Sequence, residues 1–358
     1  MNSNNNIIIY ILNNIDGSIK YILDYCESVI LNYKYNDIAD CEIYIPLLNK
    51  SILNGIKIGD FIIRETTNTD MWIVSNIEFD YSSEKGIHLI IKGKQCISLL
   101  QQRIYRGQLN TSGSYEDIIY NLFEYINSTS GYTIDPFNQV LTHYTQLEIS
   151  DGLNFQFEFE TIYNIVMTIC SAKNIHFEAK YNRRINSIDC FSESGNVTSS
   201  NIVLSQNNNS LISVKKTISN EEFCNFAFVL GEGSGTSRRY SYDSASGVLT
   251  NPNANDIYIA AFEAENISSN GNVITSEEYN NLLKNQATAY LNEHKLKNDL
   301  ELEVDMRLYK FNTNYFIGSG VFVDLPTGER ILTKVVEVSE KWDNSGYACD
   351  PVLQVINN

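Results

Sequence analysis

Residues 58–63 read IGDFII and residues 317–323 read IGSGVFV, so one pattern begins twice, near the two ends of a 358-residue chain. In both copies a second apolar run starts the same distance after the glycine: IVSNIE at 73–78 and LTKVVE at 332–337. Glycine permits a tight turn into a strand. The two matched pairs of runs therefore predict that one β unit occurs twice.

A charged turn that contains a glycine follows each copy, at 83–86 and at 343–346, and each turn leads into another apolar run. A long hairpin with alternating apolar residues can close a small barrel. The sequence thus predicts two related β-barrels with other material inserted between and within them. The alternative is that any two antiparallel hairpins look alike.

Other short β-type runs surround these copies and are bounded by Gly, Asn and Asp. They lie at 28–31, 41–45, 61–63, 72–74, 88–91, 175–179, 185–191, 226–230, 300–308, 321–325, 331–338 and 351–356.

Three segments have helical spacing of apolar residues instead. They are 114–126, where Ser114 and Asp117 form an N-cap pair, about 158–173, and about 276–296, where Thr275 and Glu278 form a capping box.

The predicted fold class is therefore α+β and mainly β, with two related small barrels, the second discontinuous, and two inserted α/β domains. We expect a first barrel at 1–105 and an inserted α+β domain at 106–206. We place the second barrel at 207–235 and 298–358, and a peripheral domain with one long helix at 236–297.

Charge and cysteine usage limit the function classes. The net charge of −17 repels phosphate backbones and argues against an ordinary nucleic-acid binder. The seven cysteines are far apart and form no CxxC, which indicates core residues in a reducing cytosol. The N-terminus lacks the basic region of a signal peptide, and the apolar run 7–12 is too short for a membrane anchor.

The sequence contains no familiar catalytic or metal-binding pattern, so we expect no catalytic residue, no metal and no cofactor. None of the four histidines, His88, His143, His176 and His294, has a zinc-ligand spacing, and no G-x-S-x-G elbow occurs. Cys–His catalysis has no local signature.

Three weaker patterns were also considered. Residues 231–235, GEGSG, follow an apolar run but do not open a helix, as a phosphate loop must, so a flexible turn is favoured. Asn251, Asn253 and Asn255 have calcium-loop spacing, but Asp256 and Phe262 stand where a glycine and a glutamate are needed. The acidic residues Asp151, Glu158 and Glu160 are better explained as a solvated helix start than as a glycosidase pair.

Four segments together resemble the baseplate hub proteins of long-tailed phages and phage-derived bacteriocins, in the branch common in phages of Gram-positive hosts. They are Gly59-Asp60, the strand end IKGK at 91–94 leading into LLQQRI at 99–104, NFAFVLGEG at 225–233, and YFIG at 315–318. They spread over nearly the whole chain in the family's order, although each alone is a weak motif. Ser319-Gly320 replaces the usual acidic residue after the last glycine.

The resemblance implies a non-enzymatic structural protein, a homotrimer whose six barrels form a ring of quasi-six-fold symmetry. Such a ring joins a six-fold tail tube or distal tail protein above to a three-fold spike, fibre or other baseplate protein below, with the tape measure protein as a further partner. It implies synthesis in the bacterial host cytoplasm and assembly into the tail baseplate. The resemblance covers contractile injection systems and non-contractile tails. The alternative functions are a tail-associated cell-wall hydrolase and a sugar-binding adhesin.

Overall fold

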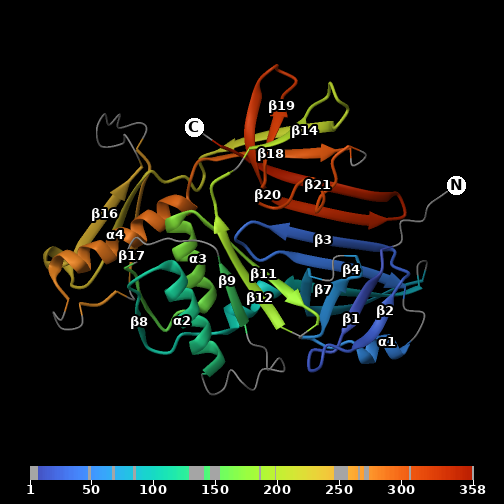
Figure 1. Cartoon of the computed structure of the whole chain (residues 1–358), viewed down its shortest axis with the longest axis horizontal. Helices are drawn as coiled ribbons and strands as arrows, with labels where there is room; N and C mark the ends of the chain where they lie inside the picture. The colour runs from blue at the N-terminus through green and yellow to red at the C-terminus, as the bar shows by residue number, and fades with distance from the viewer. Residues whose placement is uncertain are drawn as a thin grey trace.

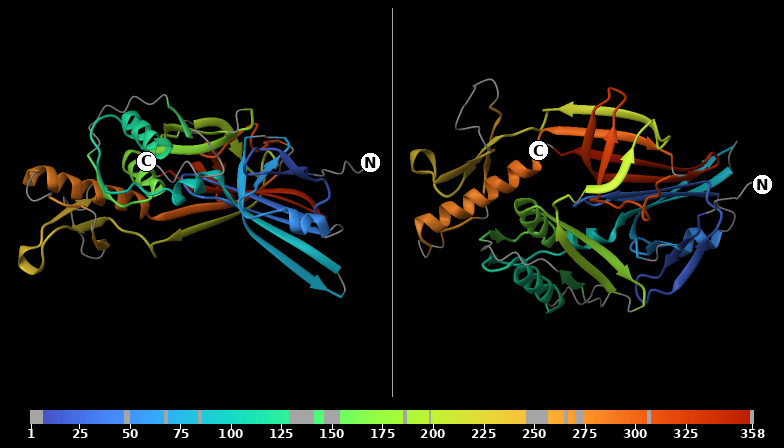
Figure 2. Two further views of the ribbon diagram at one scale, coloured as in Figure 1. Left: turned by 90° about the horizontal axis from the view of Figure 1, so that it is seen from below. Right: turned by 45° about the horizontal axis from the view of Figure 1, so that its top comes forward.

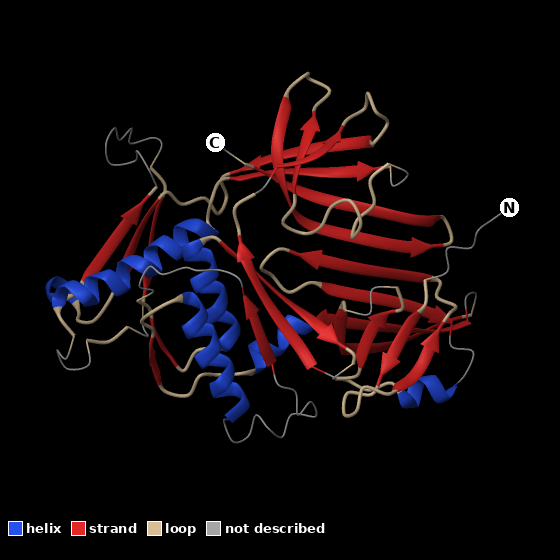
Figure 3. Ribbon diagram, in the orientation of Figure 1, coloured by secondary structure: helices blue, strands red, loops and turns tan. Residues whose placement is uncertain are grey.

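The computed structural model describes residues 7–46, 50–66, 69–83, 86–128, 141–145, 154–184, 187–197, 199–245, 257–264, 267–269, 274–305 and 308–356. As predicted, the fold is mainly β; the three longest helices lie together at one side of the molecule, and one short helix lies at the other side (Figure 3). The first part of the chain contains β1 (Ile9–Leu12), β2 (Ile19–Leu23), β3 (Ser28–Lys34), β4 (Asp40–Pro46), α1 (Lys50–Gly55), β5 (Phe61–Arg64), β6 (Met71–Ser82) and β7 (Gly86–Gln95).

The last part of the chain supplies strands of the same large sheet. They are β13 (Ser199–Leu204), β14 (Leu211–Ser219), β18 (Lys297–Val304), β19 (Gly320–Asp324), β20 (Arg330–Asp343) and β21 (Gly346–Val355). The main path of the sheet is β14-β18-β21-β20-β3-β4-β7-β6-β5-β1-β2, and β19 pairs with both β13 and β20. Strands from the two ends of the chain therefore lie side by side (Figure 1).

The two predicted repeats share one hairpin in detail. We call β3–β7 the first repeat, and β14 with β18–β21 the second repeat. The hairpins β6–β7 and β20–β21 both carry a bulge, which lies between Val74 and Asn76 in β6 and between Val335 and Glu337 in β20. A bulge shifts the pairing at one defined place. Its occurrence at matching positions makes the two hairpins equivalent residue by residue.

The sequence match of IVSNIE with LTKVVE is wrong by two residues. The backbone N–H of Gly59 donates to the Val74 carbonyl, and that of Gly318 donates to the Val335 carbonyl, both at 2.8 Å. Val74 is therefore equivalent to Val335 and not to Thr333. The reason is that β19 and β20 pair as far as Asp324 and Arg330, so the hairpin of the second repeat is longer than that of β5 and β6.

The turn before each hairpin is retained although its acidic residue is not. Gly59 and Gly318 have φ of +91° and +86°, a conformation that favours glycine. In the first repeat the Asp60 carboxylate accepts the Lys57 backbone N–H at 2.8 Å. In the second repeat the Ser319 hydroxyl accepts the Phe316 N–H at 3.0 Å. A serine hydroxyl thus takes the place of the carboxylate that the resemblance led us to expect.

A helical domain lies between the two repeats in the sequence. It contains η1 (Cys96–Gln102), β8 (Gln108–Asn110), α2 (Tyr115–Ser128), β9 (Leu141–Thr145), β10 (Gln156–Glu158), α3 (Ile162–Lys173), β11 (Ile175–Asn182) and β12 (Ser187–Ser194). The predicted cap of α2 is present, since the Asp117 N–H donates to the Ser114 hydroxyl at 3.1 Å.

The predicted start of the second helix at about 158 is wrong. Helix α3 begins at Ile162, because the Thr161 hydroxyl accepts the Asn164 N–H and caps it. Glu158 ends β10, and Phe159 has a φ of +48°, which a helix does not permit. Apolar spacing alone extended the helix by one turn.

A second small unit contains β15 (Phe226–Leu230), η2 (Gly235–Ser237), β16 (Tyr240–Ser244), β17 (Ile259–Glu263) and α4 (Ser276–Glu293). The capping box of α4 is present: Thr275 accepts the Glu278 N–H and Glu278 accepts the Thr275 N–H. Both helical units lie beside the large sheet (Figure 2).

Two strands pair differently from the expected domain assignments. Strand β15, placed in the second barrel, pairs with β16 and β17 instead, because Ala227 and Val229 pack on Tyr279 and Leu283 of α4. Strand β13, placed in the 106–206 domain, pairs with β19 of the large sheet. The division of the chain into domains otherwise stays a prediction.

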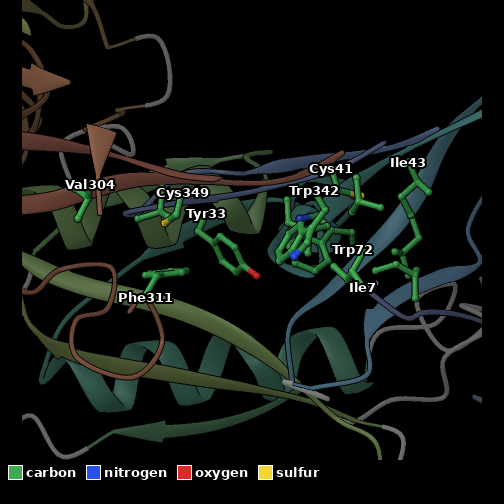
Figure 4. Packing of buried hydrophobic residues seen from close by; sticks show 14 of the residues in the cluster. Ile7, Tyr33, Cys41, Ile43, Trp72, Val304, Phe311, Trp342 and Cys349 are labelled. Atoms are coloured by element: carbon green, nitrogen blue, oxygen red, sulfur yellow. The ribbon is translucent and has the colours of Figure 1, made fainter. Parts of the chain in front are cut away.

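The hydrophobic core under the large sheet is shared by both repeats. One buried cluster includes Trp72 from β6 and Val335 from β20. Figure 4 shows Tyr33, Cys41 and Trp72 from the first part of the chain close to Trp342 and Cys349 from the last part. Burial of one contiguous core ties the two repeats together.

Candidate assembly surface

The first feature of the candidate surface is the seam, where β20 of the second repeat pairs with β3 of the first. The strands are antiparallel, with Glu337 opposite Lys34 and Trp342 opposite Val29. On the core face of the seam Val29, Leu31 and Val338 are fully buried. The chain therefore contains one edge-to-edge contact between two equivalent units.

A buried ion pair crosses the seam. Arg64 of the first repeat donates to Glu340 of the second at 2.9 Å, and its guanidinium lies 4.8 Å from the Trp342 ring centre. The Tyr347 hydroxyl donates to the other Glu340 oxygen at 2.5 Å. Burial, together with the Glu340 charge, raises the pKa of Tyr347, so this hydroxyl remains a donor. Because the carboxylate is only 2% exposed, its partners hold the two repeats in one register.

The two outer ends of the array of repeats carry strand edges with exposed apolar side chains. The first open edge is Asn76–Tyr81 of β6, which pairs only with β7 in the described part of the chain. The second open edge is β14, which pairs only with β18 there. Phe79 and Tyr81 are 58% and 65% exposed, and Ile218 of β14 is 61% exposed. Such edges are templates for another chain.

The opposite face of the sheet is polar and carries cross-strand ion pairs. Lys92 lies 2.9 Å from Glu78, Lys341 lies 2.6 Å from Asp350, and Lys215 contacts Glu301. Strand alternation places many acidic residues on this face, among them Asp40, Glu42, Glu78, Asp80, Asp299, Glu301, Glu303, Glu337, Asp343 and Asp350. Its accessible basic residues are Lys34, Lys92, Lys94, Lys215, Lys297 and Lys341. The face is therefore acidic overall.

The three histidines with described side chains contact packing partners and not one another. His88 is buried and stacks on Tyr44, with Nε2 3.3 Å from Glu27. His176 is buried against Tyr35, and desolvation lowers its pKa to about 4. His294 ends α4 and stacks on Tyr290. His143 lies in β9, where side chains are outside the description.

The glycine-rich segment and the acidic residues do not form a site among the described residues. The GEGSG segment is a turn that leads into the three-residue η2, with Gly233 and Gly235 at positive φ. Glu160 accepts the Thr161 N–H just before α3, whereas Glu158 lies in β10 and not at a helix start. Asp151 and the three asparagines 251, 253 and 255 lie outside the described residues.

The described residues contain no group of His, Cys, Asp and Glu arranged to hold a metal ion. None of their helices combines the length and apolarity that a membrane-spanning helix requires. All seven cysteines are free thiols, and six are buried. Burial raises the pKa of Cys96 and of Cys170 to about 12, which suppresses the reactive thiolate.

Two hollows open near the seam. The larger is about 1140 Å³ and is lined by Arg64, Glu340, Trp342 and residues of the β18–β19 connection. The smaller is about 450 Å³ and lies between the second repeat and β11, beside His176. Some charged lining residues of each hollow form ion pairs, such as Arg64 with Glu340 and Lys180 with Glu178. Cys349 lines the larger hollow, and burial raises the pKa of this thiol to about 12, which suppresses the reactive thiolate.

The family described as Siphovirus ReqiPepy6 Gp37-like protein matches residues 8–353, which is almost the whole chain. The chain belongs to this family. This match confirms the prediction that the chain belongs to a family of phage tail proteins. No curated protein matches the chain.

Solved structures of phage tail proteins have the same fold as this Gp37-like chain. A 43 kDa tail protein of prophage MuSo2 from Shewanella oneidensis aligns with a TM-score of 0.59 at 11% identity, covering 97% of both chains. A tail protein from Neisseria meningitidis MC58 aligns with a TM-score of 0.62 at 11% identity, covering 97% of this chain and 96% of that one. The prophage tail protein gp18 from Listeria monocytogenes EGD-e aligns at 0.55 and 10% identity, over 98% and 94%.

Sequence reasoning found the repeats but missed both open edges. The signal available was the alternation of Phe79 and Tyr81 with Glu78 and Asp80, which makes an amphipathic strand. The equivalent run in β20, Val338–Trp342, has apolar residues at both ends but the charged Glu340 in place of Phe79, so periodicity alone does not tell a covered strand from an open one.

Proposed function

We propose that the protein is the structural hub of a phage tail baseplate and adapts a six-fold tail tube to a three-fold spike or fibre. The observation that carries this proposal is the presence of two equivalent repeats in one chain, joined edge to edge in one sheet. Three such chains in a closed ring present six equivalent units on one side and three chains on the other. Homo-oligomers close most readily through repeated contacts of one kind.

The partners follow from that geometry. A tail tube or distal tail protein binds the side where the repeats are six-fold related, and a spike, fibre or other baseplate protein binds the opposite side. The tape measure protein is a further partner along the axis. The protein is made in the host cytoplasm and assembled into the particle, and its buried free thiols support folding in a reducing compartment.

The role is non-enzymatic in this proposal. His88, His176 and His294 are held by packing partners, and burial raises the pKa values of Cys96 and Cys170. The acidic outer face supports the expectation of no specific nucleic-acid binding, because carboxylates repel phosphates.

The test is an electron cryomicroscopy reconstruction of tails assembled from the complete set of tail genes. We expect three copies of the chain in a ring at the distal end of the tube. A ring of two, four or six copies, or a location along the tail tube, would contradict the proposal. Digestion of host cell walls by the purified chain would favour a tail-associated hydrolase instead.

A further inference from the structure

The two open edges occupy positions that are covered elsewhere in the same chain. In the hairpin equivalence, Phe79 and Tyr81 of β6 correspond to Glu340 and Trp342 of β20. The β20 residues are 2% and 9% exposed because β3 lies beside them. The β6 residues lie on the same face of an equivalent hairpin without such a neighbour among the described strands. The end of that hairpin projects beyond the rest of the molecule (Figure 2, left).

Strand β14 is the equivalent of β3. Gly93 of β7 and Leu353 of β21 occupy equivalent hairpin positions, and they pair with Cys41 of β4 and Leu300 of β18. Cys41 pairs in turn with Leu31 of β3, whereas Leu300 pairs with Lys216 of β14. Each repeat therefore has one edge of the β20 kind and one edge of the β3 kind.

Within the chain, an edge of the β20 kind is paired with an edge of the β3 kind at the seam. The two edges left over are one of each kind: β14 ends the path of the sheet, and Asn76–Tyr81 of β6 extends past β5, which pairs only with the first residues of β6. An unlike pair of edges on one molecule makes a head-to-tail contact, which gives a ring when the rotation closes.

We propose that β6 of one copy pairs antiparallel with β14 of the next copy, in the register of the seam. The occupant of each open edge is thus a second copy of this chain. This inference rests on the proposed ring and specifies its contact. The seam pairs Lys341 with Ile30, and their equivalents are Asp80 and Lys215. The contact therefore places Asp80 of one copy opposite Lys215 of the next.

The side chains of the two edges are complementary in this register. On the core face Ile77 meets Ile218, Phe79 meets the aliphatic part of Lys216, and Tyr81 meets Val214, so exposed apolar surface is removed from water. On the outer face the acidic Asp80 meets the basic Lys215. Opposite charges directly across a ladder are favourable, and a slip by one residue would send every side chain to the wrong face.

The backbone pattern identifies the best residues for a crosslink. The Tyr35 N–H donates to the Val336 carbonyl across the seam at 2.8 Å, so that pair is hydrogen-bonded. Pairs alternate along an antiparallel ladder, which makes Lys341 and Ile30 a non-hydrogen-bonded pair with closer side chains. Its equivalent, Asp80 with Lys215, inherits the closer spacing, which suits a disulfide.

The test uses tail particles assembled with the full chain carrying Asp80→Cys and Lys215→Cys, oxidised and then analysed by non-reducing electrophoresis and mass spectrometry. We expect a covalently closed trimer that contains the 80–215 disulfide. The matched control carries Asp80→Cys with Lys216→Cys, one residue out of register, and we expect at least a ten-fold lower yield of crosslinks. Equal crosslinking of the control would overturn the register.

The outcomes separate this contact from the proposed hub function. Three copies per particle without the disulfide would overturn the β6–β14 contact and leave the ring standing. Disulfide-linked chains closed at another copy number would support the contact and overturn the three-fold ring. A single unlinked copy per particle would overturn both.

Charge reversal gives an independent readout of the same contact. Asp80→Lys should weaken association of the chain about five-fold per contact, and adding Lys215→Asp should restore it. Unchanged association of the single variant, or failure of the double variant to recover, would overturn the charge pairing. Asp80 is exposed, so Asp80→Lys should leave thermal unfolding unchanged, whereas Lys215→Asp loses the ion pair with Glu301. Thermal unfolding of each variant alone therefore separates misfolding from a loss of association.

Discussion

The hairpins β6–β7 and β20–β21 have the same pairing and the same bulge but opposite surroundings. In β20 the core-face residues are covered by β3 and fixed by an ion pair from the other repeat. In β6 the equivalent residues are aromatic and exposed. Hairpin geometry is thus a local property, whereas burial depends on which strand lies alongside. The same hairpin can therefore lie inside a sheet in one repeat and present an open edge in the other.

Truncation of equivalent residues in the two hairpins tests most directly whether their burial differs. Trp342→Ala removes a nearly buried ring and should lower the free energy of unfolding by about 3–5 kcal/mol. Tyr81→Ala at the equivalent exposed position should change it by less than about 0.5 kcal/mol. Urea unfolding of the isolated chain measures both. Similar losses in the two variants would show that β6 is already covered within one chain.

The buried ion pair tests whether the seam depends on a contact that β6 lacks. Arg64→Ala leaves Glu340 buried without its cationic partner and should cost about 3 kcal/mol. The double substitution Arg64→Met with Glu340→Leu removes both charges and should recover most of that loss. Chemical denaturation of the three chains measures the effect. A double variant as unstable as the single one would mean that packing, not charge, dominates the seam.

A buried histidine beside the β3–β4 turn predicts that stability depends on pH. The β3–β4 turn is held by the helical domain, because His176 stacks on Tyr35 and contacts Asn36 at 3.0 Å. Burial lowers the pKa of His176 to about 4, below its value of about 6.5 in the unfolded chain. Between these values the unfolded chain binds the extra proton, so stability falls as pH decreases through this window.

We expect the His176 contribution to be about 2 kcal/mol less favourable at pH 5 than at pH 7.5. Denaturation at both pH values measures the loss, and His176→Gln serves as the control because its side chain does not titrate. If the loss is the same in His176→Gln, the pH dependence arises from other groups.

The matched turns should give the smallest effect and a similar one in each repeat. Gly59→Ala and Gly318→Ala place a side chain at φ of +91° and +86°, so each should cost about 1–2 kcal/mol. Thermal unfolding compares the two variants with the unsubstituted chain. A large effect at one glycine only would indicate that the two turns are not equivalent in energy.

Local features of the fold were predictable from the sequence. The caps at Ser114 and Thr275 depend on hydrogen bonds across three residues, and the alternation within the hairpins depends on direct neighbours. The turn glycines 59 and 318 indicated the repeat, because only a residue without a Cβ readily takes a positive φ.

Only the tertiary structure decided which strands lie together. The seam joins β3 to β20 across about 300 positions, β15 leaves the large sheet for α4, and the β19–β20 hairpin is longer than its equivalent. A strand's hydrophobic pattern says that one face is buried but not which strand or helix buries it, since many partners satisfy the same alternation. For the same reason Phe79 and Trp342 look alike in sequence, although one is exposed and the other is covered by its neighbours.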